Sequence, residues 1–188
     1  MTNNILPLGS LTNWSSETTP PLCSKNIASW LYDHNSLTKK LESQSRTFHV
    51  EVKQQVTVKA SRLPKSLFLC EDNILVREVF LCCDGKPVVF AQTEIPFSTL
   101  TEQQLILAEI GTQSLGKILF QDPTMLRGQI EVTEFEKGSL FHHLASDLKQ
   151  PMDHSLWARR SLFYLNNKPL LVSELFLPAS GIYDNLSE

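Results

Sequence analysis

The sequence predicts an α+β fold in which pairs of short helices pack against a single, mainly antiparallel β-sheet. Three observations predict it: two similar β-hairpin patterns, further stretches in which apolar and polar residues alternate, and two pairs of short helical segments. The 188 residues suit one domain, and 41% hydrophobic residues can bury a substantial core, which excludes a disordered chain. We expect residues 1–22, which are polar and contain several prolines, to form an N-terminal arm. Residues 23–188 then form one domain.

Two short helices are predicted directly after the arm. Residues 25–33 carry apolar side chains at helical spacing, and Ser36 can cap a second helix that begins with Leu37. The polar corner His34–Asn35 separates the two segments, so the pair is predicted to form a helical hairpin.

Alternation of apolar and polar residues predicts strands at residues 47–59 and 127–136. We expect the second strand to cover a helix layer with one face and to meet water with the other.

An internal near-repeat predicts two β-hairpins, because residues 77–92 resemble residues 159–174 position by position. At the two turns stand Asp84–Gly85 and Asn166–Asn167, which accept the positive φ angles of a two-residue type I′ turn. With these turns, Arg77 is predicted to lie opposite Gln92, and Arg159 opposite Glu174.

A second helical pair is predicted between the hairpins. Overlapping capping boxes within residues 99–104 open a helix that stops at Gly111, and a short helix over residues 114–120 follows. Residues 138–156 are predicted to be a local helical insertion before the second hairpin.

Composition and charge exclude several classes of protein. Lys and Arg number 17 against 20 Asp and Glu, so the broad positive surface of a nucleic-acid-binding protein is not expected. No segment approaches the roughly 18 consecutive apolar residues of a membrane span. The first 22 residues contain neither Lys nor Arg, which argues against a secretory signal, and we expect a cytoplasmic protein.

The spacing of cysteines, histidines and glycines does not match the common motifs for metal binding, phosphate binding or a catalytic nucleophile. The four cysteines (Cys23, Cys70, Cys82 and Cys83) form no C-x-x-C motif, and we expect them to be reduced, small hydrophobic residues. None of the five histidines has another at the i, i+4 spacing of a helical metal site, and no phosphate-binding loop or nucleophile elbow occurs. An enzyme with this sequence is therefore expected to work without metal, nucleotide or covalent nucleophile.

Charged residues on otherwise apolar strand faces are the first candidates for a site. In the predicted register Arg77 shares its face with Val79, Leu81, Val88 and Phe90, and Glu174 also lies among apolar residues. One interpretation is a structural Arg159–Glu174 pair and an Arg77 whose head group reaches solvent. The other is a pocket that holds an arginine and a carboxylate at separate points, which suits a small, flat anion.

The predicted helix start at Ser114–Leu115–Gly116 is a second, weaker candidate. Its free backbone N–H groups can receive a carboxylate, although every helix has such an end.

Several segments resemble chorismate pyruvate-lyases, and the resemblance extends from about residue 25 to residue 183. It rests on LVREVFLCCDGKP (75–87), IPFSTL (95–100), GTQSLGKILF (111–120) and KPLLVSELFLPAS (168–180). The resemblance implies elimination of pyruvate from chorismate to give 4-hydroxybenzoate, the first step of ubiquinone biosynthesis, without metal or cofactor. It also implies an antiparallel sheet and two helix–turn–helix flaps, around His34 and Gly111, that enclose an internal ligand cavity. We expect a monomer that binds this substrate and product, binds no nucleic acid and has no membrane span.

The resemblance also implies roles for individual residues. Arg77 matches the arginine that holds the ring carboxylate, and Leu115 matches the position whose backbone N–H meets the same carboxylate. Glu174 matches the glutamate at the 4-hydroxyl, so Arg77 and Glu174 are the implied catalytic residues. Leu37 matches a methionine that contacts the ligand. Gln92 stands where an arginine is expected, so the second carboxylate of chorismate needs help from elsewhere.

Two other classes of function remain open from the sequence. The same fold resembles the small-anion effector-sensing domain of some transcription regulators, which carry an N-terminal DNA-reading domain for which a 22-residue arm is too short. A pure interaction protein is the third class, and it predicts no enclosed cavity.

Overall fold

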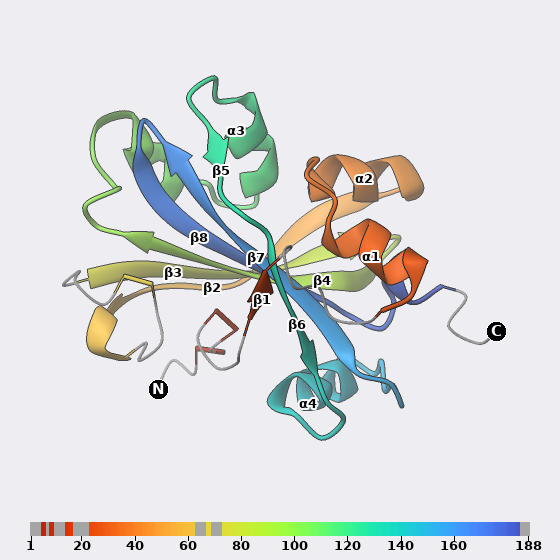
Figure 1. The fold of residues 1–188 in the computed structure, drawn as a ribbon. Coiled ribbons are helices and arrows are strands. Elements are labelled where there is room, and N and C mark those ends of the chain that lie inside the picture. Colours follow the sequence, from red (N-terminus) through yellow and green to blue (C-terminus); the bar gives the residue numbers. More distant parts are fainter. Residues whose placement is uncertain are drawn as a thin grey trace.

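An antiparallel sheet of eight strands forms the centre of the computed structural model, which describes residues 5–6, 8–9, 14–16, 23–62, 67–68 and 73–184 (Figure 1). The strand order is β1-β6-β7-β8-β4-β3-β2, and β5 pairs with one end of β7. The strands are β1 (Ser15–Ser16), β2 (Phe48–Lys59), β3 (Asn73–Cys83), β4 (Lys86–Pro96), β5 (Leu126–Arg127), β6 (Glu131–Phe135), β7 (Leu156–Leu165) and β8 (Lys168–Phe176). The predicted α+β class with one antiparallel sheet is confirmed.

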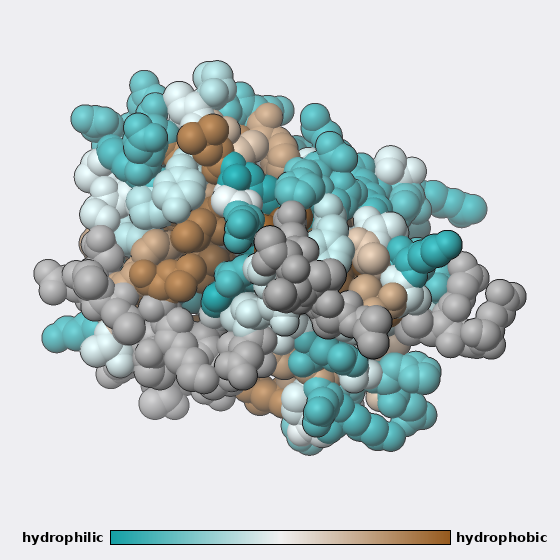
Figure 2. All heavy atoms as spheres, in the orientation of Figure 1, coloured by the Kyte–Doolittle hydropathy of each residue, from teal (hydrophilic) through white to brown (hydrophobic). Residues whose placement is uncertain are grey.

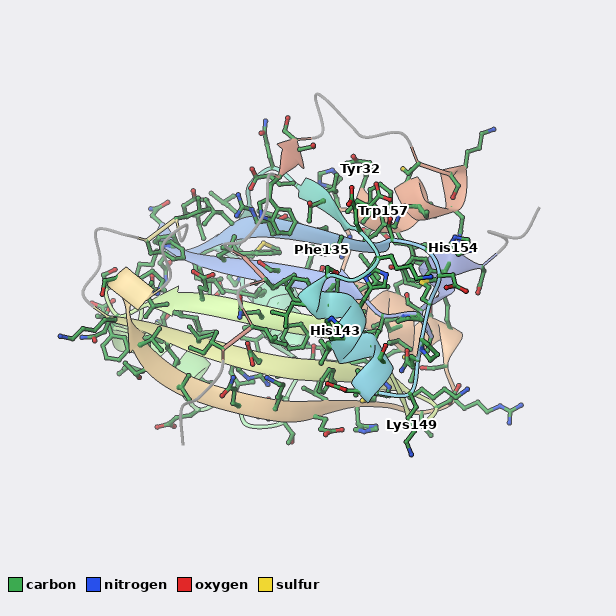
Figure 3. All side chains as sticks on the ribbon, turned by 90° about the horizontal axis from the view of Figure 1, so that it is seen from below. Tyr32, Phe135, His143, Lys149, His154 and Trp157 are labelled. Atoms are coloured by element: carbon green, nitrogen blue, oxygen red, sulfur yellow. The ribbon has the colours of Figure 1, made fainter. Side chains whose placement is uncertain are left out.

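Helical pairs lie on one side of the sheet, as the sequence predicts. They are α1 (Lys25–Leu31) with α2 (Leu37–Gln44), which we call flap 1, and η2 (Glu102–Ala108) with α3 (Leu115–Gln121), which we call flap 2. The helix α4 (Leu140–Asp147) lies on the opposite side, in front of the sheet when the molecule is seen from below (Figures 1 and 3). Two short 3₁₀ helices, η1 (Ala60–Arg62) and η3 (Gly181–Tyr183), complete the described elements.

Serine side chains fix where three of these helices begin. The hydroxyl oxygens of Ser24, Ser36 and Ser114 each accept a hydrogen bond from the backbone N–H three residues later. This is the geometry of an N-cap, which satisfies a donor that the helix leaves unpaired. The predicted starts of both α2 and α3 are therefore confirmed.

Flap 2 differs from its prediction in its first helix. Residues 102–108 form a 3₁₀ helix, and the Thr101 side chain makes no capping hydrogen bond. Leu105 and Ile106 are 55% and 59% exposed, whereas Leu107 is buried. Because only part of the apolar set reaches the core, packing does not enforce a regular α-helical turn here.

The turns of both hairpins are as predicted, with positive φ at Asp84, Gly85, Asn166 and Asn167. The β7–β8 register is also confirmed, because Arg159 pairs with Glu174.

The predicted β3–β4 register is wrong, since Arg77 lies opposite Thr93 and not opposite Gln92. A β-bulge between Leu81 and Cys82 shifts the pairing, and a shift by one residue moves every later side chain to the other face. The residues opposite Val79 and Leu81 are Ala91 and Val89, so Val88 and Phe90 do not share the face of Arg77 as predicted.

The predicted strand 127–136 is divided into β5 and β6 around Gly128. The N–H of Gly128 donates to the carbonyl of Leu162, and a Cβ on this glycine would lie 3.3 Å from that oxygen. In β6 the ring of Phe135 packs on Phe141 of α4 at 4.3 Å between centroids, which is the helix contact that alternation predicted.

Most of the predicted N-terminal arm, residues 1–22, lies outside the described residues. The described parts contact the sheet: the backbone N–H of Leu6 donates to Glu78 at 2.7 Å, and Ser15 pairs with Val132. No helix in the described ranges has both the length and the apolar character needed to cross a membrane.

Candidate active site

A pocket lies between the sheet and the two flaps. The space between its walls, including the open mouth, is about 560 Å³. The sheet, both flaps and β5 all contribute to its lining: Asn35, Leu37, Thr38, Val50, Arg77, Val79, Leu81, Ala91, Thr93, Ser114, Leu115, Gly116, Leu119, Phe120, Arg127, Arg159, Phe163, Val172 and Glu174. The visible surface of α2 is mostly polar (Figure 2), whereas the buried residues of this helix are Leu37, Thr38 and Leu41.

Two neighbouring rows of residues, which we call the floor, run across four strands beneath the pocket, and all of them except Ser161 line it. In each row, every residue is the ladder partner of the next. The first row is Arg77, Thr93, Val172 and Ser161, and the second row is Val79, Ala91, Glu174 and Arg159. The sheet therefore brings Arg77 and Glu174 to one surface, although they are far apart in the sequence.

Arg77 is buried at the floor of this pocket and is 2% exposed. Its guanidinium donates to the carbonyls of Gly111 (2.9 Å) and Gln113 (3.3 Å) in flap 2, but its Nε has no hydrogen-bond partner. Burial lowers the pKa of Arg77, and no ion pair involves it within the described ranges. The prediction that its head group reaches solvent is wrong, and a buried guanidinium with an open donor is suited to receive an anion.

Glu174 faces the pocket from β8 and is paired with Arg159, as the structural interpretation predicted. Arg159 Nε lies 2.6 Å from a Glu174 carboxylate oxygen, while the side chain of Glu174 keeps 16% exposure. Arg159 also donates to the carbonyls of Trp30 and Asp33, each at 2.9 Å, at the end of α1. One arginine thus fixes both the carboxylate and the corner of flap 1.

Leu37 and Leu115 contribute apolar walls from opposite flaps. Both residues are buried and both line the pocket. Leu115 is the first residue of α3, directly after the cap Ser114, so its backbone N–H belongs to the unpaired first turn. All four predicted site residues, Leu37, Arg77, Leu115 and Glu174, therefore line one pocket.

The two flaps touch each other above the pocket. The hydroxyls of Thr38 (α2) and Ser114 (flap 2) lie 2.7 Å apart, and Lys117 pairs with Glu42 at 2.6 Å. Gly116 permits this approach, because a Cβ at that position would lie 2.8 Å from the Thr38 hydroxyl.

Sequence analysis missed Arg127, which lines the pocket from β5. Its Nε donates to the Ser161 hydroxyl (3.1 Å), its Nη1 donates to the Asp33 carbonyl (3.3 Å), and its guanidinium lies 5.2 Å from the centre of the Phe163 ring. The only sequence signal for this residue was its position at the start of the predicted strand 127–136, directly before the glycine that divides this strand. Only the pairing of β5 with β7 places it at the pocket.

Gln92 does not line the pocket, because the bulge turns it to the other face of the sheet. Its amide donates to Glu78 at 3.0 Å and to the carbonyl of Leu6. It therefore contributes to holding the N-terminal segment and offers nothing to a second carboxylate in the pocket.

The strand positions next to those that face the pocket carry three potential metal ligands. The sequence analysis did not predict that these residues lie together. The ligand atoms of His49, Glu51 and Cys82 lie within 4.8 Å of one another. Burial, together with Glu51 and Cys83, raises the pKa of the Cys82 thiol to about 11, so it stays protonated at neutral pH. Cys23, Cys82 and Cys83 are free thiols, and Cys70 lies outside the described residues.

Comparison with known families gives a match over nearly the whole chain. A family model described as chorismate lyase matches residues 9–187. A probable chorismate pyruvate-lyase of Psychromonas ingrahamii is 62% identical over 180 residues, which cover 95% of this chain and 97% of that protein. The chorismate pyruvate-lyase of Escherichia coli is 34% identical over 165 residues, covering 87% of this chain and 89% of that protein.

Solved structures with a similar fold include an effector domain and a gene product of unstated function. The effector domain of PhnF from Mycobacterium smegmatis has a TM-score of 0.51 at 13% identity, covering 76% of this chain and 88% of that one. A Staphylococcus aureus gene product has a TM-score of 0.53 at 13% identity, and the match covers 77% of this chain and 89% of that one. At such low identity these likenesses show the fold alone.

Proposed function

The chain belongs to the chorismate lyase family, and from that premise we propose that it eliminates pyruvate from chorismate to give 4-hydroxybenzoate. The observation that carries the proposal is one pocket whose floor holds a buried arginine and a glutamate at separate points. The arginine has no ion-pair partner among the described residues, whereas the glutamate is paired with Arg159. A flat six-membered ring with a carboxylate at one end and a hydroxyl at the other matches this arrangement.

The binding roles follow from the chemistry of each group. Arg77 and the backbone N–H of Leu115 hold the ring carboxylate from two sides, the arginine from β3 and the N–H from the start of α3. Glu174 accepts the hydrogen bond of the 4-hydroxyl while Arg159 keeps its carboxylate in place. Leu37 covers the ring from flap 1.

The reaction is an elimination that makes the ring aromatic. The bond between ring carbon C3 and the ether oxygen breaks, the oxygen keeps the electron pair, and the C4–H electrons complete the aromatic ring. The enolpyruvate fragment gains a proton and becomes pyruvate. Aromatisation supplies much of the driving force, so the protein has to fix the dianion, exclude water and stabilise charge on the departing oxygen.

This chemistry supports further features of the proposal. It needs no metal or cofactor, and we expect an active monomer. The family's reaction is the first step of ubiquinone biosynthesis, and we expect this protein to carry it out in the cytoplasm.

Incubating the purified protein with chorismate tests the proposal. We expect 4-hydroxybenzoate, followed by its absorbance, and pyruvate in equal amounts, with the same rate after treatment with a chelator. Saturable binding of 4-hydroxybenzoate without turnover of chorismate would instead indicate a non-catalytic effector-sensing domain. Light scattering on the eluted peak tests the monomer.

A further inference from the structure

The pocket lining offers one arginine beyond the two that already have a role. Its lining includes three arginines and one glutamate, a formal charge of +2. Arg159 is neutralised by Glu174, and Arg77 is the anchor for the ring carboxylate in the proposed function. Chorismate carries a second carboxylate on its enolpyruvyl arm, and Gln92, at the position where the family resemblance leads one to expect an arginine, faces away from the pocket.

Arg127 lies at the far end of the floor row that starts with Arg77. Three strand spacings, about 14 Å, separate the backbone of Arg77 from that of Ser161. Arg127 donates to the Ser161 hydroxyl at that end. Both arginines line the same pocket, so a ligand with an anionic group at each end can lie between them.

The surroundings of Arg127 hold its guanidinium in one orientation. The ring of Phe163 lies beneath it, Ser161 fixes Nε, and the carbonyl of Asp33 fixes Nη1. A guanidinium fixed in this way loses little further freedom when it binds a carboxylate with its planar donor edge. Arg127 is half-buried, at the seam between β5 and the corner of flap 1.

We propose that Arg127 binds the enolpyruvyl carboxylate of chorismate, at the opposite end of the pocket floor from Arg77; this inference rests on the proposed function. Glu174, in the neighbouring row, then meets the hydroxyl that lies beside the ether. The substrate engages both arginines, whereas 4-hydroxybenzoate, which lacks the arm, engages only Arg77. Arg127 therefore distinguishes the dianionic substrate from the monoanionic product.

The test compares substrate and product in the full-length variant Arg127→Ala. We expect kcat/KM for chorismate to fall about 30-fold or more, the low end for removing one partner of a buried charge pair. The dissociation constant of 4-hydroxybenzoate, measured by calorimetry, should change by less than about threefold, because the product makes no contact with this side chain. Arg46→Ala, which removes an exposed positive charge outside the pocket, should change neither quantity.

Equal losses for both ligands would show that Arg127 only holds flap 1 in place, and an unchanged kcat/KM would show that it binds nothing; either result overturns the inference. If Arg127→Ala is unfolded by circular dichroism, Arg127→Lys decides. Its ammonium keeps the charge without the planar donor edge, so kcat/KM should fall about tenfold with product affinity retained, and parallel losses would refute the assignment. A wild-type protein that does not turn over chorismate contradicts the proposed function itself, independently of Arg127.

Discussion

Arg77 combines three properties that rarely occur together in a residue with a purely structural role. It is almost fully buried, its described hydrogen bonds go to backbone carbonyls, and its Nε has no partner. A buried positive charge without a counter-ion is costly, and a bound anion removes that cost. The carbonyls of Gly111 and Gln113 hold the guanidinium in place for this anion.

Replacing Arg77 by Ala should weaken 4-hydroxybenzoate binding by about 2–5 kcal/mol, since the ring carboxylate loses its charged partner in a desolvated site. Calorimetric titration of the product measures this loss. Arg46→Ala serves as the matched control for the lost charge. A change below a few tenths of a kcal/mol would remove Arg77 from the anchor role.

Glu174→Gln separates orientation of the 4-hydroxyl from removal of the C4 proton. We expect kcat to fall only about tenfold, because a glutamine oxygen still accepts a hydrogen bond and the proton can pass directly to the leaving arm. A general base is worth about 10²–10⁴ in rate, so a fall of three powers of ten or more with product affinity retained would identify Glu174 as the base. Thermal unfolding of the variant controls for the unpaired Arg159 that it creates.

The sequence identified residues of the pocket more reliably than it identified which residues lie beside them. Arg77, Glu174, Leu37 and Leu115 all line the pocket, and the first two could be recognised as charges on apolar strands. Arg127 could not be found in this way, because its place depends on how β5 pairs with β7.

At the scale of secondary structure, local signals were reliable where one residue decides the conformation. Serine N-caps mark the starts of α2 and α3, and pairs of residues with positive φ form the turns of both hairpins. The bulge at Leu81–Cys82 carries no such signal, because it depends on tertiary packing and not on a residue that requires it. One inserted residue was enough to turn Gln92 away from the pocket.

The contact between flaps depends on Gly116, and Gly116→Ala tests it. The added methyl group meets the Thr38 hydroxyl at 2.8 Å, and relieving such overpacking costs about 1–3 kcal/mol, so α2 and α3 should separate. Alanine also stabilises a helix by about 1 kcal/mol relative to glycine. We therefore expect little change in thermal stability but about tenfold weaker 4-hydroxybenzoate binding.

A double-mutant cycle with Thr38→Ala provides the control for this prediction. Thr38→Ala removes the oxygen that the new methyl group meets, so adding Gly116→Ala to that variant should cost little further affinity. An equal loss in both backgrounds would mean that the glycine acts through α3 alone and not through the contact between flaps.

At the scale of the whole molecule, one sheet supports a buried floor while separate helices close it. The strands that carry the two floor rows lie side by side in the centre of the sheet, so the floor is rigid. The flaps are joined to that floor and to each other by a few polar contacts, among them Arg159 with the end of α1 and Thr38 with Ser114. Apolar side chains of both flaps also pack on the sheet, but continuous strand pairing joins only the floor. We therefore expect the flaps to open more readily than the sheet deforms.

This architecture predicts that product release limits turnover. A 4-hydroxybenzoate molecule held by Arg77 and Glu174 leaves only when the flaps separate, so rapid mixing with chorismate should give a burst of product equal to the enzyme concentration before the steady state. Gly116→Ala, with its loosened contact, should raise the steady-state rate while leaving the burst rate unchanged. A linear time course from the first turnover would place the slow step at or before the elimination. The flaps would then protect the reaction from water without controlling its rate.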